Sequence, residues 1–189
     1  MVPSAPGKRD SKDTKVTDML YDCYKTAEEG EEFKGKLKLI KARYDEIISG
    51  LGLTLSLDSE FKTIEENFKK QLGENYAASR GEYLNGIIMA DYLGFAFVDA
   101  AKVIFFKENG MWDEEKTKET LGAELAKHDK VVVPGFYGSL PDGTVRTFSR
   151  GGSDITGSIV AQAVRADVYE NWTDVSGFLI VDPRIIKDP

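Results

Sequence analysis

Apolar residues recur every three or four positions through much of the first seventy residues, which is the period of helices with one buried face. A charged, helical region is therefore predicted between Thr17 and Gln71. Residues 50–52, Gly-Leu-Gly, predict the end of one helix, and Asp58 predicts the start of the next. The residues expected to form the buried faces of these two helices are Leu37, Ile40, Tyr44, Ile47, Ile48, Phe61, Ile64 and Phe68.

A different pattern begins near Ser79, where short apolar runs alternate with amphipathic stretches. Helices are predicted over residues 82–93, 113–127 and 153–166. The first of them is expected to begin at Gly81-Glu82, to end at Gly94 and to bury Leu84, Ile87, Ile88 and Tyr92. Strands are predicted over residues 95–98, 103–106, 130–136 and 168–172, with a hairpin turn at Pro141-Asp142-Gly143. This alternation predicts an α/β fold, a three-layer sandwich with a mainly parallel central sheet and a helical N-terminal segment.

The composition fits one soluble domain. A chain of 189 residues with 41% hydrophobic and 30% charged residues can bury a sizeable core. Within a single domain spanning residues 1–189, we expect a helix-rich part over residues 1–78 and an α/β core over residues 79–189. The net charge of −7 argues against a nucleic-acid surface, because binding to a phosphate backbone requires clustered lysine and arginine.

Targeting and redox features point to the cytoplasm. No stretch approaches 18 apolar residues, and the first four residues, Met-Val-Pro-Ser, do not resemble a signal peptide, so no membrane interaction is expected. The single cysteine, Cys23, cannot form an internal disulfide and fits a reducing compartment. With only one histidine besides, His128, the composition argues against a structural zinc site and a Cys/His catalytic pair.

The segment Arg150-Gly151-Gly152-Ser153-Asp154 stands immediately before the apolar residues of a predicted helix. Glycines at such a position let backbone N–H groups approach an anion, and the helix dipole favours negative charge there. Ser153 or Asp154 is predicted to cap the helix, and Arg150 can clamp a carboxylate or phosphate. The alternative is a glycine turn before a capped helix, with an exposed arginine and no ligand. Neither the dinucleotide-binding Gly-x-Gly-x-x-Gly nor the Walker pattern is present.

Four further residues carry candidate chemistry. Thr173 and Asp174 follow the predicted strand 168–172, at the strand end where open α/β sheets bind ligands. The alternative is a tight Asp-Val-Ser-Gly turn that satisfies its own backbone. Arg184 is either a ligand contact or a surface charge. Glu82 stands at a predicted helix start, where the dipole favours a carboxylate in any protein. The alternative is that it faces a pocket and holds an ammonium group.

Together these motifs resemble the amino-acid kinase family, and within it the aspartate kinases. The combination of Arg-Gly-Gly-Ser-Asp with Trp-Thr-Asp-Val is the most specific part, because related kinases of uridylate, glutamate, acetylglutamate or carbamate usually lack it. The resemblance implies an α/β sandwich and ATP-dependent phosphorylation of the β-carboxylate of L-aspartate, the entry step to lysine, threonine and methionine synthesis. The matching segments, in the family's order and spacing, are residues 4–7, 16–18, 79–82, 134–136, 150–154, 172–177 and 182–184.

The resemblance also implies a role for each matching residue. Glu82 would face the α-ammonium group of aspartate, Arg150 would face a carboxylate, and Asp154 would organise the reacting centre. Mg²⁺ would be held largely by ATP oxygens, so that positioning and charge neutralisation supply the rate. The residues implied to line the aspartate site are Thr17, Glu82, Phe136, Arg150 and Ser153, and those implied to contact the nucleotide are Thr173, Asp174 and Arg184.

The chain also departs from the family's pattern. The family's first strand, Lys-Phe-Gly-Gly, and its C-terminal regulatory domains have no counterpart, and Leu179 stands where a tyrosine often packs near the nucleotide. We therefore expect an incomplete catalytic domain that is weakly active or inactive alone. Two alternatives stay open, namely a non-catalytic module that binds aspartate or nucleotide and a family member with another substrate. A homo-oligomer also stays open.

Overall fold

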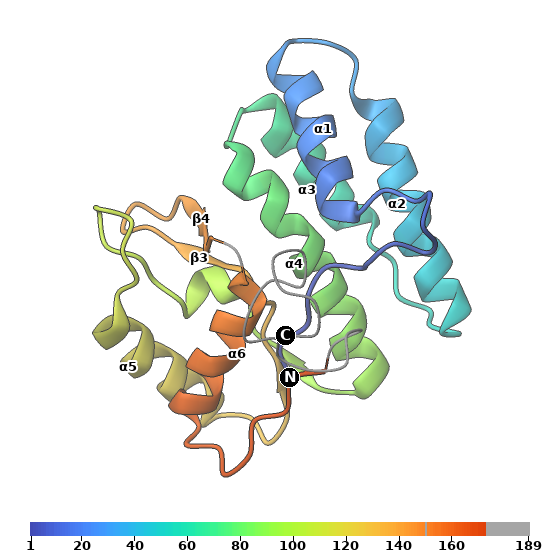
Figure 1. The fold of residues 1–189 in the computed structure, drawn as a ribbon. Helices are drawn as coiled ribbons and strands as arrows, with labels where there is room; N and C mark the ends of the chain where they lie inside the picture. The colour runs from blue at the N-terminus through green and yellow to red at the C-terminus, as the bar shows by residue number, and fades with distance from the viewer. Residues whose placement is uncertain (150, 173–189) are drawn as a thin grey trace, which may run out of the picture.

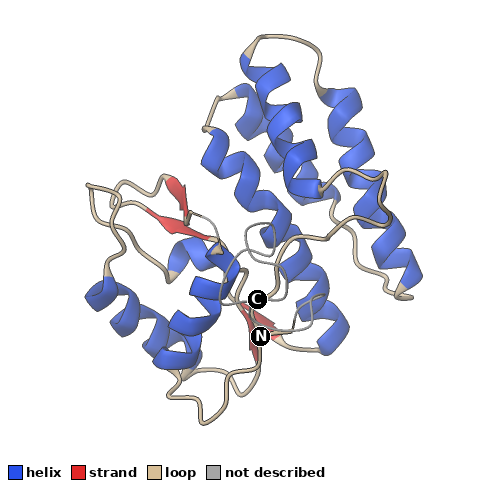
Figure 2. Cartoon of the chain, viewed as in Figure 1, coloured by secondary structure: helices blue, strands red, loops and turns tan. Residues whose placement is uncertain are grey.

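The computed structural model describes residues 1–149 and 151–172. Figure 1 shows α1, α2 and α3 gathered on one side of α4, whereas the strands, α5 and α6 lie on its other side. Helices predominate, and the strands are short (Figure 2). The described elements are α1 (Val16–Glu28), α2 (Lys34–Gly50), α3 (Asp58–Lys69), α4 (Glu74–Leu93), β1 (Ala96–Phe97), the 3₁₀ helix η1 (Ala100–Lys102), α5 (Glu114–Leu125), β2 (Val131–Val132), β3 (Tyr137–Ser139), β4 (Val145–Thr147) and α6 (Gly152–Ala163).

The helical part confirms the apolar periodicity of the first seventy residues. Helix α2 ends at Gly50 and α3 begins at Asp58, as predicted. Of the predicted buried positions only Ile47 remains partly exposed. Full burial of a large apolar side chain contributes about 1.5–3 kcal/mol, so this cluster accounts for much of the stability of the helical part. Its largest fully buried members are Leu20, Tyr24, Ile40, Tyr44, Leu57, Ile64, Phe68, Leu84 and Ile88.

The predicted start of the central helix is wrong. Helix α4 begins at Glu74, after Gly73 in a positive-φ conformation (φ 92°), and it ends as predicted at Gly94 (φ 65°). Its first turns are buried on nearly every side, and a helix without an exposed face lacks the apolar periodicity that marks a helix in the sequence. Glu82 therefore lies in the middle of a helix, where the dipole at the helix start does not reach it. Tyr92, expected to be buried, is exposed.

The strands form two small sheets within the described residues. β1 and β2 pair in parallel, and β3 and β4 form the predicted antiparallel hairpin. The N-terminal residues extend the parallel pair, because the Val133 N–H donates to the Met1 carbonyl (3.0 Å) and the Gly135 N–H donates to the Pro3 carbonyl (3.1 Å). This pairing places Ser4 beside the start of α6, where both line the same cavities.

Two predicted strands are wrong. Residues 103–106 follow η1 and make only single bridges to Ser139 and Trp112. Residues 168–172 form no strand either, because Tyr169 packs on α6 at Gly157, where the absence of a side chain leaves room for its ring. The parallel sheet is therefore smaller than predicted. The helices predicted over residues 113–127 and 153–166 are confirmed as α5, which is shorter at both ends, and α6, which begins one residue earlier and ends three residues earlier than predicted.

A second apolar cluster holds the strands, α5 and α6 together, and Tyr83 of α4 packs against both clusters. The predicted boundary between residues 78 and 79 falls inside α4, and it stays a prediction.

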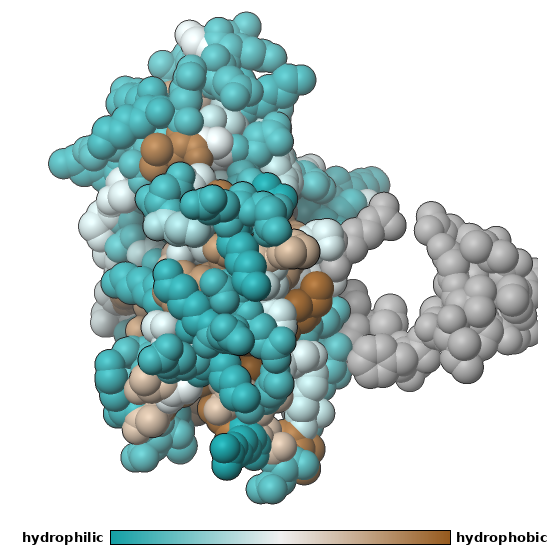
Figure 3. Space-filling view, turned by 90° about the vertical axis from the view of Figure 1, so that its left-hand side faces the viewer, coloured by the Kyte–Doolittle hydropathy of each residue, from teal (hydrophilic) through white to brown (hydrophobic). Residues whose placement is uncertain are grey.

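Hydrophilic residues predominate on the face drawn in Figure 3, where hydrophobic residues lie in small separate groups. Across residues 1–149 and 151–172, no helix combines the length and the apolar character that crossing a membrane requires.

Candidate active site

Two adjoining cavities meet at the start of α6. The smaller cavity measures about 520 Å³ and the larger about 1120 Å³. Ser4, Ser153 and Asp154 line both. The smaller cavity is completed by Tyr21, Phe136, Thr147, Phe148, Ser149, Gly151 and Gly152. The larger one extends along α6 between the N-terminal residues, α4 and residues 169–172.

The start of α6 is suited to an anion. Gly151 precedes the helix in the left-handed conformation (φ 72°) and has no side chain that could accept a bond from the first N–H groups. These N–H groups and the helix dipole together favour a negative charge at this point. The prediction that Ser153 or Asp154 caps the helix is wrong, because the helix begins at Gly152 and both residues lie in its first turn.

Two glycines allow this helix start to approach the loop that carries Phe136. A Cβ on Gly135 would lie 2.9 Å from the Ser153 Cα, and a Cβ on Gly152 would lie 2.6 Å from the Phe136 ring. Phe136 itself adopts a positive φ of 80°, which is strained for a bulky residue. Its N–H donates to the hydroxyl of buried Thr156 (3.1 Å), and this bond helps to hold the strained conformation against α6.

Glu82 is a buried carboxylate close to the smaller cavity. Its side chain is 6% exposed, and its Oε2 has no hydrogen-bond partner among the described residues. Burial raises the pKa of Glu82 from 4.5 to about 7, although the backbone N–H groups of Glu82 and Ala5 and the charge of Arg80 oppose this shift. A cation entering beside Glu82 would find a carboxylate that forms no ion pair with a described side chain and has one oxygen without a hydrogen-bond partner.

The neighbours of Glu82 come from two segments distant in sequence. Ala5 packs on Gly81, where a Cβ would lie 2.9 Å from the Ala5 Cβ, and the Thr17 hydroxyl lies 3.7 Å from the same point. Tyr44 donates a hydrogen bond from its hydroxyl to the Gly81 carbonyl (2.8 Å). The N-terminal loop and α1 thus bring Thr17 and Glu82 together at the middle of α4.

The structure brings the five site candidates among the described residues into one region. Phe136, Ser153 and Asp154 line the smaller cavity directly. Thr17 and Glu82 do not line it, but they lie near its lining residues, because Ala5, which follows Ser4, packs on Gly81, and Thr17 precedes Tyr21 by one helical turn. The remaining candidates, Arg150, Thr173, Asp174 and Arg184, lie outside the described residues.

Sequence reasoning missed several lining residues. Tyr21 could have been found, because it lies four positions after Thr17 and therefore on the same face of α1. Ser4 belongs to a motif that carried the family resemblance but was given no role. Thr147 and Ser149 were not identifiable, because only the β3–β4 pairing turns this end of the hairpin toward the cavity.

A metal ion would find two carboxylates at these cavities, that of Asp154, which lines both, and that of Glu170, which lines the larger one. Among the described residues there is no group of three or more histidine, cysteine, aspartate or glutamate side chains that could hold a metal by itself. Asp154 is exposed at the junction of the two cavities, and the Asn171 amide donates to its Oδ1 (3.2 Å). This donor set fits Mg²⁺ carried by substrate phosphates, because such ions often take only one or two protein carboxylates.

Comparison with known proteins identifies the family. Residues 16–189 match the amino acid kinase family. Aspartokinase 3 of Bacillus subtilis is 34% identical over all of this chain, which spans 45% of that protein. The aspartate kinase of Clostridium acetobutylicum is 51% identical with a TM-score of 0.90, over 100% of this chain and 43% of that one.

A more distant structure supports the same fold. Escherichia coli aspartokinase III, solved in complex with aspartate and ADP, is 24% identical with a TM-score of 0.78 over 99% of this chain and 45% of that one. The chain thus spans a little under half of each of these relatives. Its α/β architecture is that of the aspartokinases, as the motifs in the sequence predicted. The chain therefore belongs to the amino acid kinase family.

Proposed function

We propose that this chain contributes the substrate-binding part of an aspartate kinase, which transfers the γ-phosphoryl group of ATP to the β-carboxylate of L-aspartate. The observation that carries this proposal is the junction of two cavities at the start of α6, because a phosphoryl donor and its acceptor must meet in line. The similarity to aspartokinases over the whole chain supports the choice of substrate. So does the E. coli relative, in which aspartate and ADP are bound together.

Aspartate is proposed to occupy the smaller cavity. Glu82 would accept hydrogen bonds from its α-ammonium group, which supplies the missing partner for a buried carboxylate. Arg150 would hold a carboxylate, and Thr17, Phe136 and Ser153 would complete the site. The first turn of α6 would then lie beside the β-carboxylate, the group that accepts the phosphoryl.

The nucleotide is proposed to occupy the larger cavity, with its phosphates toward α6. In the reaction a β-carboxylate oxygen attacks the γ-phosphorus, the bond from phosphorus to the ADP oxygen breaks, and 4-phospho-L-aspartate and ADP result. The N–H groups at the start of α6 would stabilise the charge that develops on the transferring group. Mg²⁺ would neutralise phosphate charge when bound with ATP, and Asp154 would orient the reacting groups. Thr173, Asp174 and Arg184 are proposed nucleotide contacts.

Finer aspects of the proposal follow from the same similarity. The product would enter lysine, threonine and methionine synthesis, and the single, buried Cys23 is compatible with a cytoplasmic protein. Two alternatives from the sequence remain, a non-catalytic aspartate- or nucleotide-binding module and a family kinase with another acceptor. Glutamate is the most informative competing ligand, because it differs from aspartate by one methylene group.

Calorimetric titration of the 189-residue chain with L-aspartate, L-glutamate and Mg-ATP tests the proposal. Binding of aspartate about tenfold or more tighter than glutamate is expected, together with separate binding of Mg-ATP. Tighter binding of glutamate, or no binding of aspartate, would contradict the proposed substrate. Aspartate-dependent ADP formation by the same sample then separates a kinase from a non-catalytic module.

A further inference from the structure

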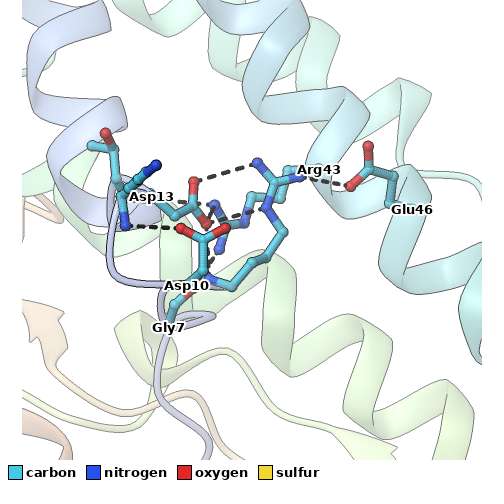
Figure 4. Close-up of polar contacts among 8 residues, drawn as sticks. Gly7, Asp10, Asp13, Arg43 and Glu46 are labelled. Atoms are coloured by element: carbon cyan, nitrogen blue, oxygen red, sulfur yellow. Dashed lines mark hydrogen bonds and ion pairs between the residues drawn. The ribbon is translucent and has the colours of Figure 1, made fainter.

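An arginine cluster fixes the loop between the two segments that reach Glu82. The cluster consists of Arg43 on α2 with the loop residues Gly7, Asp13 and Thr14 (Figure 4). The Arg43 guanidinium donates to an Asp13 carboxylate oxygen (2.5 Å), to the Thr14 carbonyl (3.3 Å) and to the Gly7 carbonyl. One side chain thus joins both ends of the loop formed by residues 7–14.

The inner part of this cluster is buried. The Arg43 and Asp13 side chains are 5% and 11% exposed, so their ion pair is partly shielded from solvent and salt. Arg9 binds the same carboxylate from outside and is 59% exposed, and it also pairs with Glu46. Hydrogen bonds from Arg9 and from Arg43 hold the pKa of Asp13 well below its usual value, so the carboxylate stays ionised near neutral pH.

The loop ends where the candidate aspartate site begins. Ala5, two residues before Gly7, packs on Gly81, and its backbone N–H favours the ionised form of Glu82 and so lowers the pKa of that carboxyl group against the effect of burial. Beyond the other end, α1 starts at Val16 and places the Thr17 hydroxyl beside Gly81. The loop residues themselves are largely exposed, so the contacts to Arg43 are a main restraint on this part of the backbone.

We propose that Arg43 is a positioning residue for the aspartate site, acting through the loop at residues 7–14 to hold Ala5 and Thr17 against α4 beside Glu82. The proposal rests on the proposed function for the identity of the ligand. Its effect is specific to the smaller cavity. Met1 and Pro3, which line the larger cavity, are held independently by backbone hydrogen bonds to Val133 and Gly135.

The test compares the variants R43M and R43K with R9M, a matched control that removes the exposed arginine from the same carboxylate. In calorimetric titrations, R43M is expected to weaken aspartate binding at least tenfold and to change Mg-ATP binding less than twofold. R43K should restore aspartate binding only in part, because an ammonium group lacks the planar guanidinium that reaches two loop segments at once. R9M should bind both ligands like the unmodified chain.

Two measurements need no ligand. Hydrogen exchange at the amides of residues 5–17 should be at least tenfold faster in R43M than in the unmodified chain, and should change much less in R9M, which keeps the Arg43 contacts to both ends of the loop. Carboxyl ¹³C NMR should show a higher pKa for Glu82 in R43M, because the Ala5 N–H no longer offsets burial, and no change in R9M. If R43M does not fold by circular dichroism, R43K provides the same comparisons.

The outcomes separate this proposal from the proposed function. A folded Arg43 variant that binds aspartate like the unmodified chain would overturn the positioning role. So would a variant that weakens aspartate and Mg-ATP binding equally. If the unmodified chain binds no aspartate, the proposed function fails. The exchange rates and the Glu82 titration then still decide, since unchanged values in the Arg43 variants overturn the positioning role and altered values support it.

Discussion

Replacing Glu82 with glutamine is expected to stabilise the fold above neutral pH and to remove tight aspartate binding. Both effects have one cause, a buried carboxylate that forms no ion pair among the described residues. Natural proteins tolerate such a group where it serves a ligand, and its cost to stability then marks the site. The substitution should raise the free energy of unfolding and lower the affinity for aspartate, and the two quantities are measured separately.

The effect on stability follows from the raised pKa of Glu82. The unfolded chain releases the Glu82 proton near pH 4.5 and the folded chain near pH 7, so between these values the unfolded state binds fewer protons. The free energy of unfolding therefore falls as pH rises through this window, by about 2–3 kcal/mol between pH 5 and pH 8. E82Q should lack this contribution, and denaturant titrations of both proteins at the two pH values measure it. A glutamine amide without an acceptor would offset the gain equally at both pH values.

The effect on binding follows from the loss of a charged partner. Removing one member of a buried, hydrogen-bonded charge pair costs about 2–5 kcal/mol, which weakens aspartate binding by roughly 30-fold or more. Calorimetry with aspartate at pH 8, where the Glu82 of the unmodified chain is ionised, gives the comparison. Mg-ATP binding should change little, because Glu82 is proposed to bind the ammonium group of aspartate and no part of the nucleotide.

The exposed Glu66 on α3 is a suitable control for Glu82. E66Q removes the same charge at a position on α3 that lines neither cavity. It should change the free energy of aspartate binding, and the difference in unfolding free energy between the two pH values, by no more than about 0.5 kcal/mol each. Aspartate affinity retained in E82Q would show that this carboxylate does not hold the ligand. An equal dependence of unfolding on pH in E82Q and the unmodified chain would show that Glu82 titrates normally.

The sequence predicted elements with one buried and one exposed face. The stripes of α2 and α3 and the turn of the β3–β4 hairpin are local signals, and the structure confirms them. Helix α4 begins eight residues before the predicted start, because it is packed between two apolar clusters and shows no periodic exposed face. Residues 168–172 have the composition of a strand, but Tyr169 packs against Gly157 instead of joining a sheet.

The candidate site was predictable only in its local part. Gly151 and Gly152 predicted a helix start suited to an anion, since that signal is contained in five consecutive residues, and the structure confirms the helix start. The environment of Glu82 was not predictable from its own segment, because Ala5 and Tyr44, distant in sequence, determine its surroundings. Arg43 was missed for the same reason, since its partners are about thirty residues away.

Replacing Gly135 with alanine is expected to weaken binding in both cavities. A Cβ at this position would lie 2.8 Å from the Ser153 Cβ and 2.9 Å from the Ser153 Cα, so α6 has to move away from the loop. Overpacking of this kind costs about 1–3 kcal/mol of stability. Because Ser153 lines both cavities, a shift on the order of 1 Å should weaken aspartate and Mg-ATP binding by about tenfold or more.

Gly122 provides the matched control for this substitution. It lies within α5, and a Cβ there would meet no atom within 4 Å. G122A should therefore raise the free energy of unfolding by about 0.5–1 kcal/mol through helix propensity and leave both ligands unaffected. Denaturant titration of the two variants measures the change in stability, and calorimetry measures the change in ligand binding. If G135A bound both ligands like G122A, the close approach of α6 to the loop would not be what builds the junction of the two cavities.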